Sequence, residues 1–210
     1  MYLIAHRGLT TNDIKENTIE SFKNALKNKY DGIELDIRYT KDKKIVIHHD
    51  YLINRTSNGK GSLKKYSYNE LKKFNFGSKK IPQKIPLLID VIKIIKNTII
   101  FIELKEKINV KDLINIIKRN KTNQYYICSF NFNFIKDFIN TDYKVGLINN
   151  IFNSKDIYNK LDFVMILENI FNMDIYNKMM QNNIEVVLYG TLNNISLKNK
   201  EILAKIKYII

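Results

Sequence analysis

The feature that most constrains this chain is the regular alternation of short apolar runs with amphipathic stretches along its 210 residues. The apolar runs are rich in β-branched and aromatic residues and are nearly continuous, which is typical of strands buried on both faces. The amphipathic stretches repeat apolar residues three or four positions apart, as on one face of a helix. Alternating strands and helices predict an α/β fold with a parallel sheet, and so many repeats in a chain of this length favour a closed (β/α)8 barrel.

The strand count leaves one point of the topology open. The runs that indicate strands are residues 2–5, 32–37, 45–49, 99–104, 125–129, 145–148, 163–167, 185–189 and 206–210. A barrel of this kind needs eight strands, and only residues 38–44 join the second and third runs. Because parallel neighbours normally need a crossover of about a dozen residues, one of the runs is expected to be a hairpin arm or an irregular return.

The charge balance is strongly basic but does not choose a partner. The chain has 35 Lys and Arg against 21 Asp and Glu, a formal charge of +14, and a pI near 9.6. Only four of the basic residues are Arg, and the lysines are spread along the whole length. This distribution favours a scattered, solvated basic surface over a polyanion-binding one, so we expect no nucleic-acid partner.

Cysteine use and hydropathy bound the class of protein. Cys128 is the one cysteine, which excludes an internal disulfide framework and a multi-cysteine zinc cluster. No apolar run approaches the roughly 18–20 residues that cross a bilayer. Residues 1–5 are too short for the apolar part of a secretory leader. We therefore expect residues 1–210 to form a single soluble domain in the cytoplasm.

Polar residues gather where the predicted strands end. His6 and Arg7 follow the first strand, and His49 ends the third. Two pairs of charged residues lie two positions apart, Glu34 with Asp36 in the second strand and Glu103 with Lys105 at the end of the fourth. Strand alternation points the members of each pair to one side, and the carboxyl ends of barrel strands share one face. His48 is expected to point the other way and to be structural.

The combination of these side chains indicates metal-assisted phosphoester chemistry. Burying several carboxylates in an apolar barrel mouth is costly unless a cation neutralises them. Carboxylate oxygens suit Mg²⁺ or Ca²⁺ better than zinc. Arg7 and Lys105 suit a phosphate beside such an ion, and histidines transfer protons near pH 7.

An ordered series of short motifs runs through residues 2–133. Its members are His6-Arg7-Gly8, Glu16-Asn17-Thr18, Phe22, Ala25, Glu34-Leu35-Asp36, Thr40-Lys41-Asp42, His49-Asp50, Leu52, Arg55-Thr56, Gly59, Gly61, Glu70-Leu71, Ile85-Pro86, Glu103, Lys105 and Ser129-Phe130. In order and spacing this series resembles the glycerophosphodiester phosphodiesterase family, in the form of a short bacterial-type member. The resemblance is thin after residue 133.

The resemblance implies a TIM-like barrel that hydrolyses glycerophosphodiesters to glycerol 3-phosphate and an alcohol. It implies that Glu34, Asp36 and Glu103 bind one divalent ion, Mg²⁺ or Ca²⁺. It further implies that His6 and His49 are the general acid and base and that Arg7 and Lys105 contact phosphate. A cyclic phosphate intermediate, later opened by water, belongs to the same implied mechanism.

The second half of the chain departs from the family pattern. The family's Trp-Thr-Val-Asn motif is replaced by Gly190-Thr191-Leu192-Asn193, and the final strand lacks its usual polar tip. The barrel is therefore expected to be small and trimmed at its C-terminal end, with closure that is weak or completed by a partner. Tyr189 and Asn193 are either substitute substrate contacts or simple packing residues.

Three smaller expectations and several alternatives accompany this interpretation. Asn17 fits the N-cap of the helix that starts near residue 19, and the loop before it, which leaves the catalytic face, also keeps a role near the site open. Ser129 is a candidate for the barrel mouth, and Cys128 is expected to be a buried thiol. A phospholipase-D-like enzyme and an enzyme that processes a glycerophosphate polymer remain open on the same fold. A non-catalytic, polyanion-binding barrel is the alternative from another class, and self-association also stays open.

Overall fold

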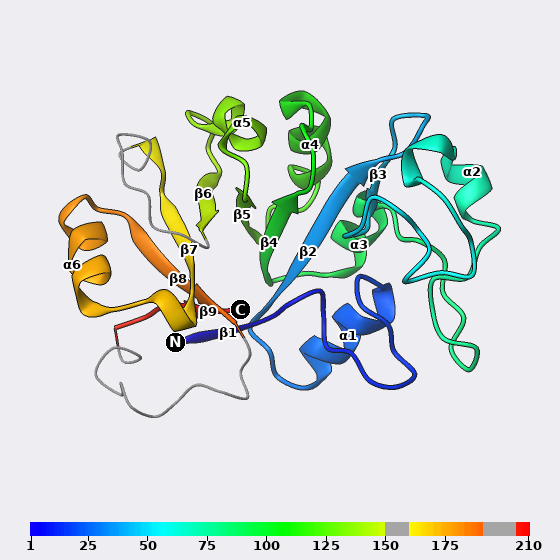
Figure 1. Ribbon diagram of the computed structural model, residues 1–210, viewed down its shortest axis with the longest axis horizontal. Coiled ribbons are helices and arrows are strands. Elements are labelled where there is room, and N and C mark those ends of the chain that lie inside the picture. The colour runs from blue at the N-terminus through cyan, green and yellow to red at the C-terminus, as the bar shows by residue number, and fades with distance from the viewer. Residues whose placement is uncertain (150–159, 191–204) are drawn as a thin grey trace.

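The computed structural model describes residues 1–149, 160–190 and 205–210, and within them eight parallel strands close into a barrel (Figure 1). These strands are β1 (Tyr2–Ala5), β2 (Gly32–Tyr39), β4 (Ile99–Leu104), β5 (Gln124–Ser129), β6 (Lys144–Asn149), β7 (Phe163–Leu167), β8 (Glu185–Tyr189) and β9 (Tyr208–Ile209). Each strand pairs with the next in this order, and β9 pairs with β1 to complete the ring. The TIM-like (β/α)8 barrel predicted from the alternation is confirmed.

Helices cover the outside of the ring. They are α1 (Ile19–Lys27), α3 (Leu88–Ile94), α4 (Val110–Ile117), α5 (Phe132–Ile135) and α6 (Met173–Gln181), with short 3-10 turns at Lys136–Phe138 and Glu168–Ile170. Side chains that cap the first turn start several of them: Asn109, Asn131 and Asn172 each accept a hydrogen bond from a backbone N–H there. Each helix turns its apolar residues toward the barrel, as Phe22 and Ala25 of α1 do.

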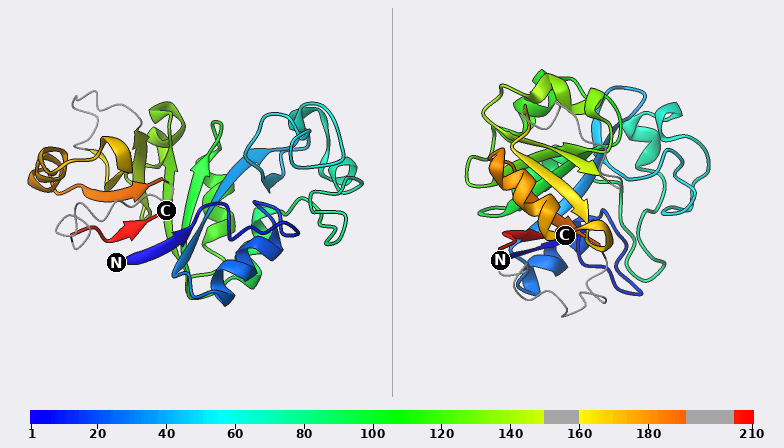
Figure 2. Two further views of the ribbon diagram at one scale, coloured as in Figure 1. Left: turned by 60° about the horizontal axis from the view of Figure 1, so that its bottom comes forward. Right: turned by 60° about the vertical axis from the view of Figure 1, so that its left-hand side comes forward.

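The ninth predicted strand is the arm of a hairpin. β3 (Ile45–Ile47) runs antiparallel to β2, with Ile37 opposite Ile47, and it lies outside the ring. The segment that follows, residues 48–87, contains a 3-10 turn (Leu63–Lys65) and α2 (Tyr68–Leu71). It projects from one side of the barrel in both views (Figure 2). A small core of its own supports it, formed by Val46, Ile53, Leu63, Leu71, Phe76 and Ile85.

Strand alternation divides the main core into two layers. One set of residues packs between strands and helices, and the other fills the barrel interior. The interior is rich in aromatic rings: Phe101 stacks on Tyr126 with centroids 4.5 Å apart, and Phe163 and Tyr208 pack edge-on against Phe101. Gly146 leaves room for this cluster, because a Cβ there would lie 2.4 Å from the Phe163 ring.

The barrel closes within the chain. The last strand is shorter than the predicted run of residues 206–210, but backbone hydrogen bonds extend its pairing on both sides. The N–H of Tyr2 donates to the carbonyl of Lys207 (2.6 Å), and the N–H of Gly190 donates to the carbonyl of Ile210 (3.2 Å). Inside the ring, the hydroxyls of Tyr126 and Tyr208 are hydrogen-bonded at 2.6 Å. The expectation that a partner completes the closure is therefore not met.

Hydropathy adds one finding about membranes. Among residues 1–149, 160–190 and 205–210, every helix is too short or too polar to cross a bilayer.

The hydroxyl pair gives a stability test of the closure. Tyr208→Phe should lower the free energy of unfolding by about 1–3 kcal/mol, because the buried Tyr126 hydroxyl loses its partner. The double variant Tyr126→Phe/Tyr208→Phe should recover part of that loss, since neither polar group remains buried alone. Urea denaturation of the three proteins measures both effects. A single variant as stable as the parent would contradict the anchoring role of the pair.

Candidate active site

A cavity of about 440 Å³ opens at the carboxyl ends of the barrel strands. One side is polar and the other apolar. The lining residues are His6, Arg7, Glu34, His49, Glu103, Phe130, Ile148, Met165, Leu167, Tyr189, Gly190 and Ile210. Five of the seven residues singled out from the sequence therefore line one cavity. The other two contact lining residues: Asp36 lies beside Arg7, and Lys105 beside Glu103.

Three buried carboxylates gather at the polar side, and two of them line the cavity. Glu34 and Asp36 project inward from β2, and Glu103 projects from β4, where it is the register partner of Asp36. One oxygen from each carboxylate lies within 4.8 Å of the others, and all three residues are buried. The strand alternation that predicted this convergence is confirmed.

Burial and the proximity of the carboxylates to one another change their pKa values. Burial first, and then the charges of Asp36 and Glu103, raise the pKa of Glu34 well above its ordinary value. Burial and the charge of Asp36 raise the pKa of Glu103 to about 7, against the opposing influence of Lys105. The positive charge around the three carboxylates is thus too small to hold the pKa values of Glu34 and Glu103 at their ordinary level.

Two basic side chains contact the carboxylates. Lys105 Nζ donates to Glu103 Oε1 at 2.6 Å and lies 3.8 Å from Asp36 Oδ1. Arg7 Nε lies 3.3 Å from Asp36 Oδ2, and its backbone N–H donates to Glu34 Oε2 at 3.0 Å. Both cations stand beside the carboxylates, where an anionic substrate group would also be attracted.

The two candidate histidines approach the cavity from different parts of the chain. His6 follows β1, with Nε2 3.8 Å from Glu34 Oε2, and 58% of its side chain is exposed. Partial burial and the charge of Arg7 lower its pKa. His49 follows the hairpin arm β3, and its Nδ1 lies 2.6 Å from Asp50 Oδ1. His48 points away from the cavity, is buried against Phe76, and contacts the Leu52 carbonyl through Nε2, as predicted.

A sharp turn after β1 places His6 and Arg7. Arg7 and Gly8 both have positive φ, at 56° and 79°. A Cβ at Gly8 would lie 2.4 Å from Ser21 Oγ, so the close approach of α1 requires glycine here. Ser21 Oγ also donates to the Arg7 carbonyl at 3.1 Å, which fixes the turn to the start of α1.

The predicted role of Asn17 is wrong. The N-cap of α1 is Thr18, whose side chain accepts from the N–H of Ser21. Asn17 has φ of 55°, and its Nδ2 donates to Asp36 Oδ2 at 2.8 Å. The left-handed backbone turns Asn17 back toward the barrel, where it supports the carboxylate group. A site role was open from the loop position, but the N-cap preference of Asn pointed to the neighbouring residue.

Other contacts of the site have no local sequence signal. Arg38 Nε donates to the carbonyl of His49 at 2.8 Å and so anchors the end of the hairpin arm. Glu16, Asp50 and Arg55 form ion pairs with one another and with Arg7 and His49. Their partners lie up to 39 residues apart, so only the fold reveals them, although the motifs quoted above include all three.

The remaining sequence expectations have mixed outcomes. Cys128 is fully buried, and burial raises the pKa of its thiol well above the ordinary value, as expected of an unreactive cysteine. Ser129 is buried and donates to the carbonyl of Leu104, so it does not face the cavity. Tyr189 lines the apolar side. Asn193 lies outside the described residues.

The carboxylate group fits a hard divalent cation. Glu34 Oε1 and Asp36 Oδ1 are buried without a hydrogen-bond partner, and two acids of the three have raised pKa values. Oxygen donors from three carboxylates suit Mg²⁺ or Ca²⁺. The protein's own donors leave this negative charge incompletely compensated, and an ion would complete it.

Comparison with known proteins finds relatives that are named glycerophosphodiester phosphodiesterases. The model of the glycerophosphoryl diester phosphodiesterase family matches residues 6–208. A glycerophosphodiester phosphodiesterase of Caldanaerobacter subterraneus is 39% identical over 147 residues, which are 64% of this chain and 60% of that protein. One of Bacillus altitudinis is 41% identical over 113 residues, 50% of this chain and 46% of that protein. The chain thus matches about half of the length of these relatives.

Solved structures share the whole fold. An Oleispira antarctica phosphodiesterase in complex with the product sn-glycerol-3-phosphate superposes with a TM-score of 0.87 at 21% identity, over 100% of this chain and 92% of that one. A glycerophosphodiester phosphodiesterase of Agrobacterium tumefaciens gives 0.82 at 20% identity, over 100% and 95%. With the match of the family model over nearly the whole sequence, these findings show that the chain belongs to the glycerophosphoryl diester phosphodiesterase family.

Proposed function

We propose that this protein hydrolyses a glycerophosphodiester to glycerol 3-phosphate and an alcohol, with the help of one divalent cation. The observation that carries the proposal is the buried group of Glu34, Asp36 and Glu103 at the wall of a cavity that also holds both candidate histidines. The names of the relatives and the product bound to the Oleispira enzyme support the same reaction class. A small-molecule diester is therefore the proposed partner.

In this proposal Glu34, Asp36 and Glu103 hold Mg²⁺ or Ca²⁺. When bound, the cation supplies charge neutralisation for phosphate oxygens in the ground state and in the transition state. Lys105 and Arg7 already lie against the same carboxylates, and they bind the remaining phosphate oxygens through charged N–H donors. Together these groups orient the phosphorus atom next to the histidines.

His6 and His49 carry out proton transfer in the proposed reaction. One imidazole takes the proton of the attacking glycerol hydroxyl, and the other gives a proton to the oxygen of the leaving alcohol. The resulting cyclic phosphate is opened by water, with the proton transfers reversed. The lowered pKa of His6 keeps its imidazole neutral at pH 7 and thus available to accept a proton.

Two accompanying proposals concern the setting of the reaction. We place the protein in the cytoplasm, which the single buried thiol of Cys128 supports because no disulfide is needed for its fold. We treat residues 1–210 as one domain, which the continuous ring of strands from β1 to β9 supports.

Removal of either histidine should abolish most of the activity. His6→Ala and His49→Ala should each lower kcat by roughly 10²–10⁴-fold toward glycerophosphocholine, the usual contribution of general acid–base catalysis. Release of glycerol 3-phosphate, measured in a coupled assay, gives the rate. His48→Asn is the matched control, because His48 faces away from the cavity; its activity per folded molecule should stay within a few fold of the parent. Full activity in both alanine variants would overturn the proposal.

The carboxylate group also makes stability depend on pH and on the cation. The pKa of Glu103 rises from 4.5 to about 7 on folding, so its contribution to stability is present below pH 4.5 and is lost as the pH rises through 7. Cation binding needs the ionised ligands and should reverse this loss. The gain is about 2.7 kcal/mol at a cation concentration of about 100 Kd.

Thermal unfolding with EDTA, Mg²⁺ or Ca²⁺ at pH 5.5 and pH 8 checks this expectation. The rise in Tm caused by the preferred cation should be larger at pH 8. Glu103→Gln should reduce that rise and flatten the pH dependence of the cation-free protein. An equal cation effect at both pH values would contradict a site built from these carboxylates.

A further inference from the structure

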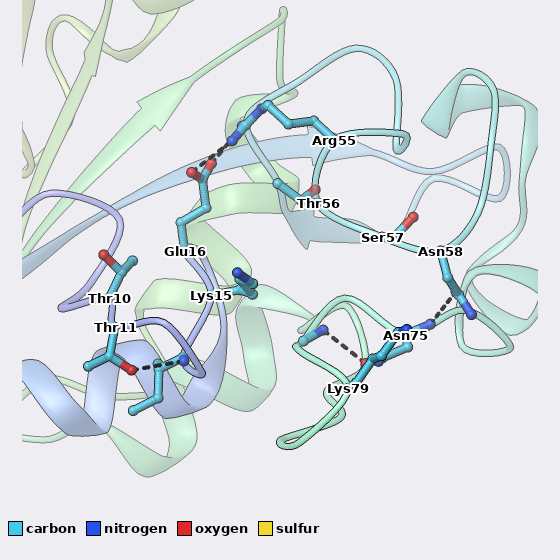
Figure 3. A pocket seen from close by; sticks show the side chains of 12 residues that line it. Thr10, Thr11, Lys15, Glu16, Arg55, Thr56, Ser57, Asn58, Asn75 and Lys79 are labelled. Atoms are coloured by element: carbon cyan, nitrogen blue, oxygen red, sulfur yellow. Dashed lines mark hydrogen bonds and ion pairs between the residues drawn. The ribbon is translucent and has the colours of Figure 1, made fainter.

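Arg55 lies at the centre of a chain of ion pairs beside the candidate active site. Its Nη1 and Nη2 donate to the two oxygens of Glu16 at 2.9 and 2.7 Å, a contact visible in Figure 3. Its Nε and Nη2 donate to the two oxygens of Asp50 at 2.7 and 3.1 Å. The guanidinium therefore joins two carboxylates that come from different parts of the chain, the β1–α1 loop and the segment after β3.

Each carboxylate contacts a different residue of the cavity. Asp50 Oδ1 lies 2.6 Å from Nδ1 of His49, and Glu16 Oε1 accepts from Nη1 of Arg7 at 3.1 Å. The ionic chain thus runs from one proposed proton-transfer residue to one proposed phosphate-binding residue. Within the described residues, Arg55 is the one side chain that contacts both of these carboxylates.

We propose that Arg55 is a positioning residue that sets His49 and Arg7 together, through Asp50 and Glu16, in the geometry needed for the reaction. This inference rests on the proposed function of the site. It assigns the joint placement of His49 and Arg7 to one guanidinium, which touches neither the cavity nor the carboxylate group.

The contact with Asp50 also fixes the proton on His49. The hydrogen bond from Arg55 holds the pKa of Asp50 well below its usual range, so this carboxylate is ionised and can only accept. Nδ1 of His49 must then carry the proton, which leaves Nε2 as the nitrogen that can act as a base. Without Arg55, Asp50 would be free to rotate away from the imidazole.

Arginine suits this position better than lysine. Its planar fork presents donors in several directions from one rigid group, whereas a lysine ammonium is a single point that cannot pair with both oxygens of two carboxylates at once. Half of the Arg55 side chain is exposed. The Glu16 and Asp50 side chains are only 21% and 24% exposed, and bidentate pairs joined in a network add to stability. The effect of losing Arg55 on the reaction is therefore measured per folded molecule.

The same two segments are joined by a second ion pair that serves as a matched control. Lys80 Nζ lies 2.7 Å from Asp13 Oδ2, which links the segment after β3 to the β1–α1 loop without contacting His49 or Arg7. If Arg55 only tethered the segments, Lys80→Met and Arg55→Met would behave alike.

Steady-state kinetics on glycerophosphocholine separates the roles. Arg55→Met should lower kcat/KM on the order of 10²-fold, the usual cost of misplacing a reacting group by about 1 Å. Asp50→Asn should act mainly on kcat through His49, and Glu16→Gln mainly on KM through Arg7. Arg55→Lys should recover part of the loss, and Lys80→Met should match the parent in kcat and KM.

Nitrogen-15 NMR of the histidines gives a readout that does not depend on activity. The chain has three histidines, so the signals of His49 can be assigned by substitution. The parent protein should show His49 protonated at Nδ1, and Arg55→Met should show a smaller population of that tautomer. Unchanged kcat, KM and tautomer in Arg55→Met, with an active parent, would overturn the inference. An inactive parent with the tautomer shift intact would instead overturn the proposed function alone.

Discussion

The mutual repulsion of three buried carboxylates is the constraint around which this site is organised. Glu34, Asp36 and Glu103 hold oxygens within 4.8 Å of one another, and all three residues are buried. Such an arrangement persists only if donors and cations surround it. The backbone N–H of Arg7, the amide of Asn17 and the ammonium of Lys105 each donate a hydrogen bond to one of the three acids. The protein's own donors nevertheless leave Glu34 Oε1 and Asp36 Oδ1 without hydrogen bonds.

The carboxylate side chains point into the barrel because they share the inner face of its sheet with the aromatic residues that fill its interior. Phe101 and Glu103 lie two residues apart on β4, so the alternation that buries the Phe101 ring inside the barrel also turns Glu103 into its mouth. The last strand, β9, is only two residues long, and the hydroxyl pair of Tyr126 and Tyr208 ties it to β5. A register error in one strand would move its ring and its acid to the outside together, which couples correct folding to a complete site.

The periodic parts of the structure could be predicted from the sequence, and the local turns and distant pairings could not. The alternation was sufficient to place Glu34, Asp36 and Glu103 on one face and His48 opposite His49. The N-cap prediction for Asn17 failed by one residue, because Thr18 and Asn17 both favour caps and only the left-handed backbone at Asn17 decides between them. The contacts of Arg55 depend on where a long projecting segment folds, which no local pattern encodes. Residues 191–193, which stand where the family has the end of its Trp-Thr-Val-Asn motif, lie outside the described residues.

The site residues come partly from the barrel and partly from the projecting segment, so ion pairs between distant residues are needed to hold them together. The rigid strands hold the carboxylates, and the turn after β1 holds His6 and Arg7. His49, however, stands at the end of a hairpin arm outside the ring, and this arm leads into a segment with its own small core. Backbone pairing of the arm with β2 extends to the N–H of His48, which donates to the carbonyl of Asp36 at 2.8 Å. Beyond that point, contacts between loops help to set the position of His49. Arg38 holds the backbone of His49, and the chain Asp50–Arg55–Glu16 holds its side chain relative to Arg7. In the proposed reaction the two histidines act on opposite oxygens of one phosphate and need a fixed separation, which polar contacts between loops would supply in this fold.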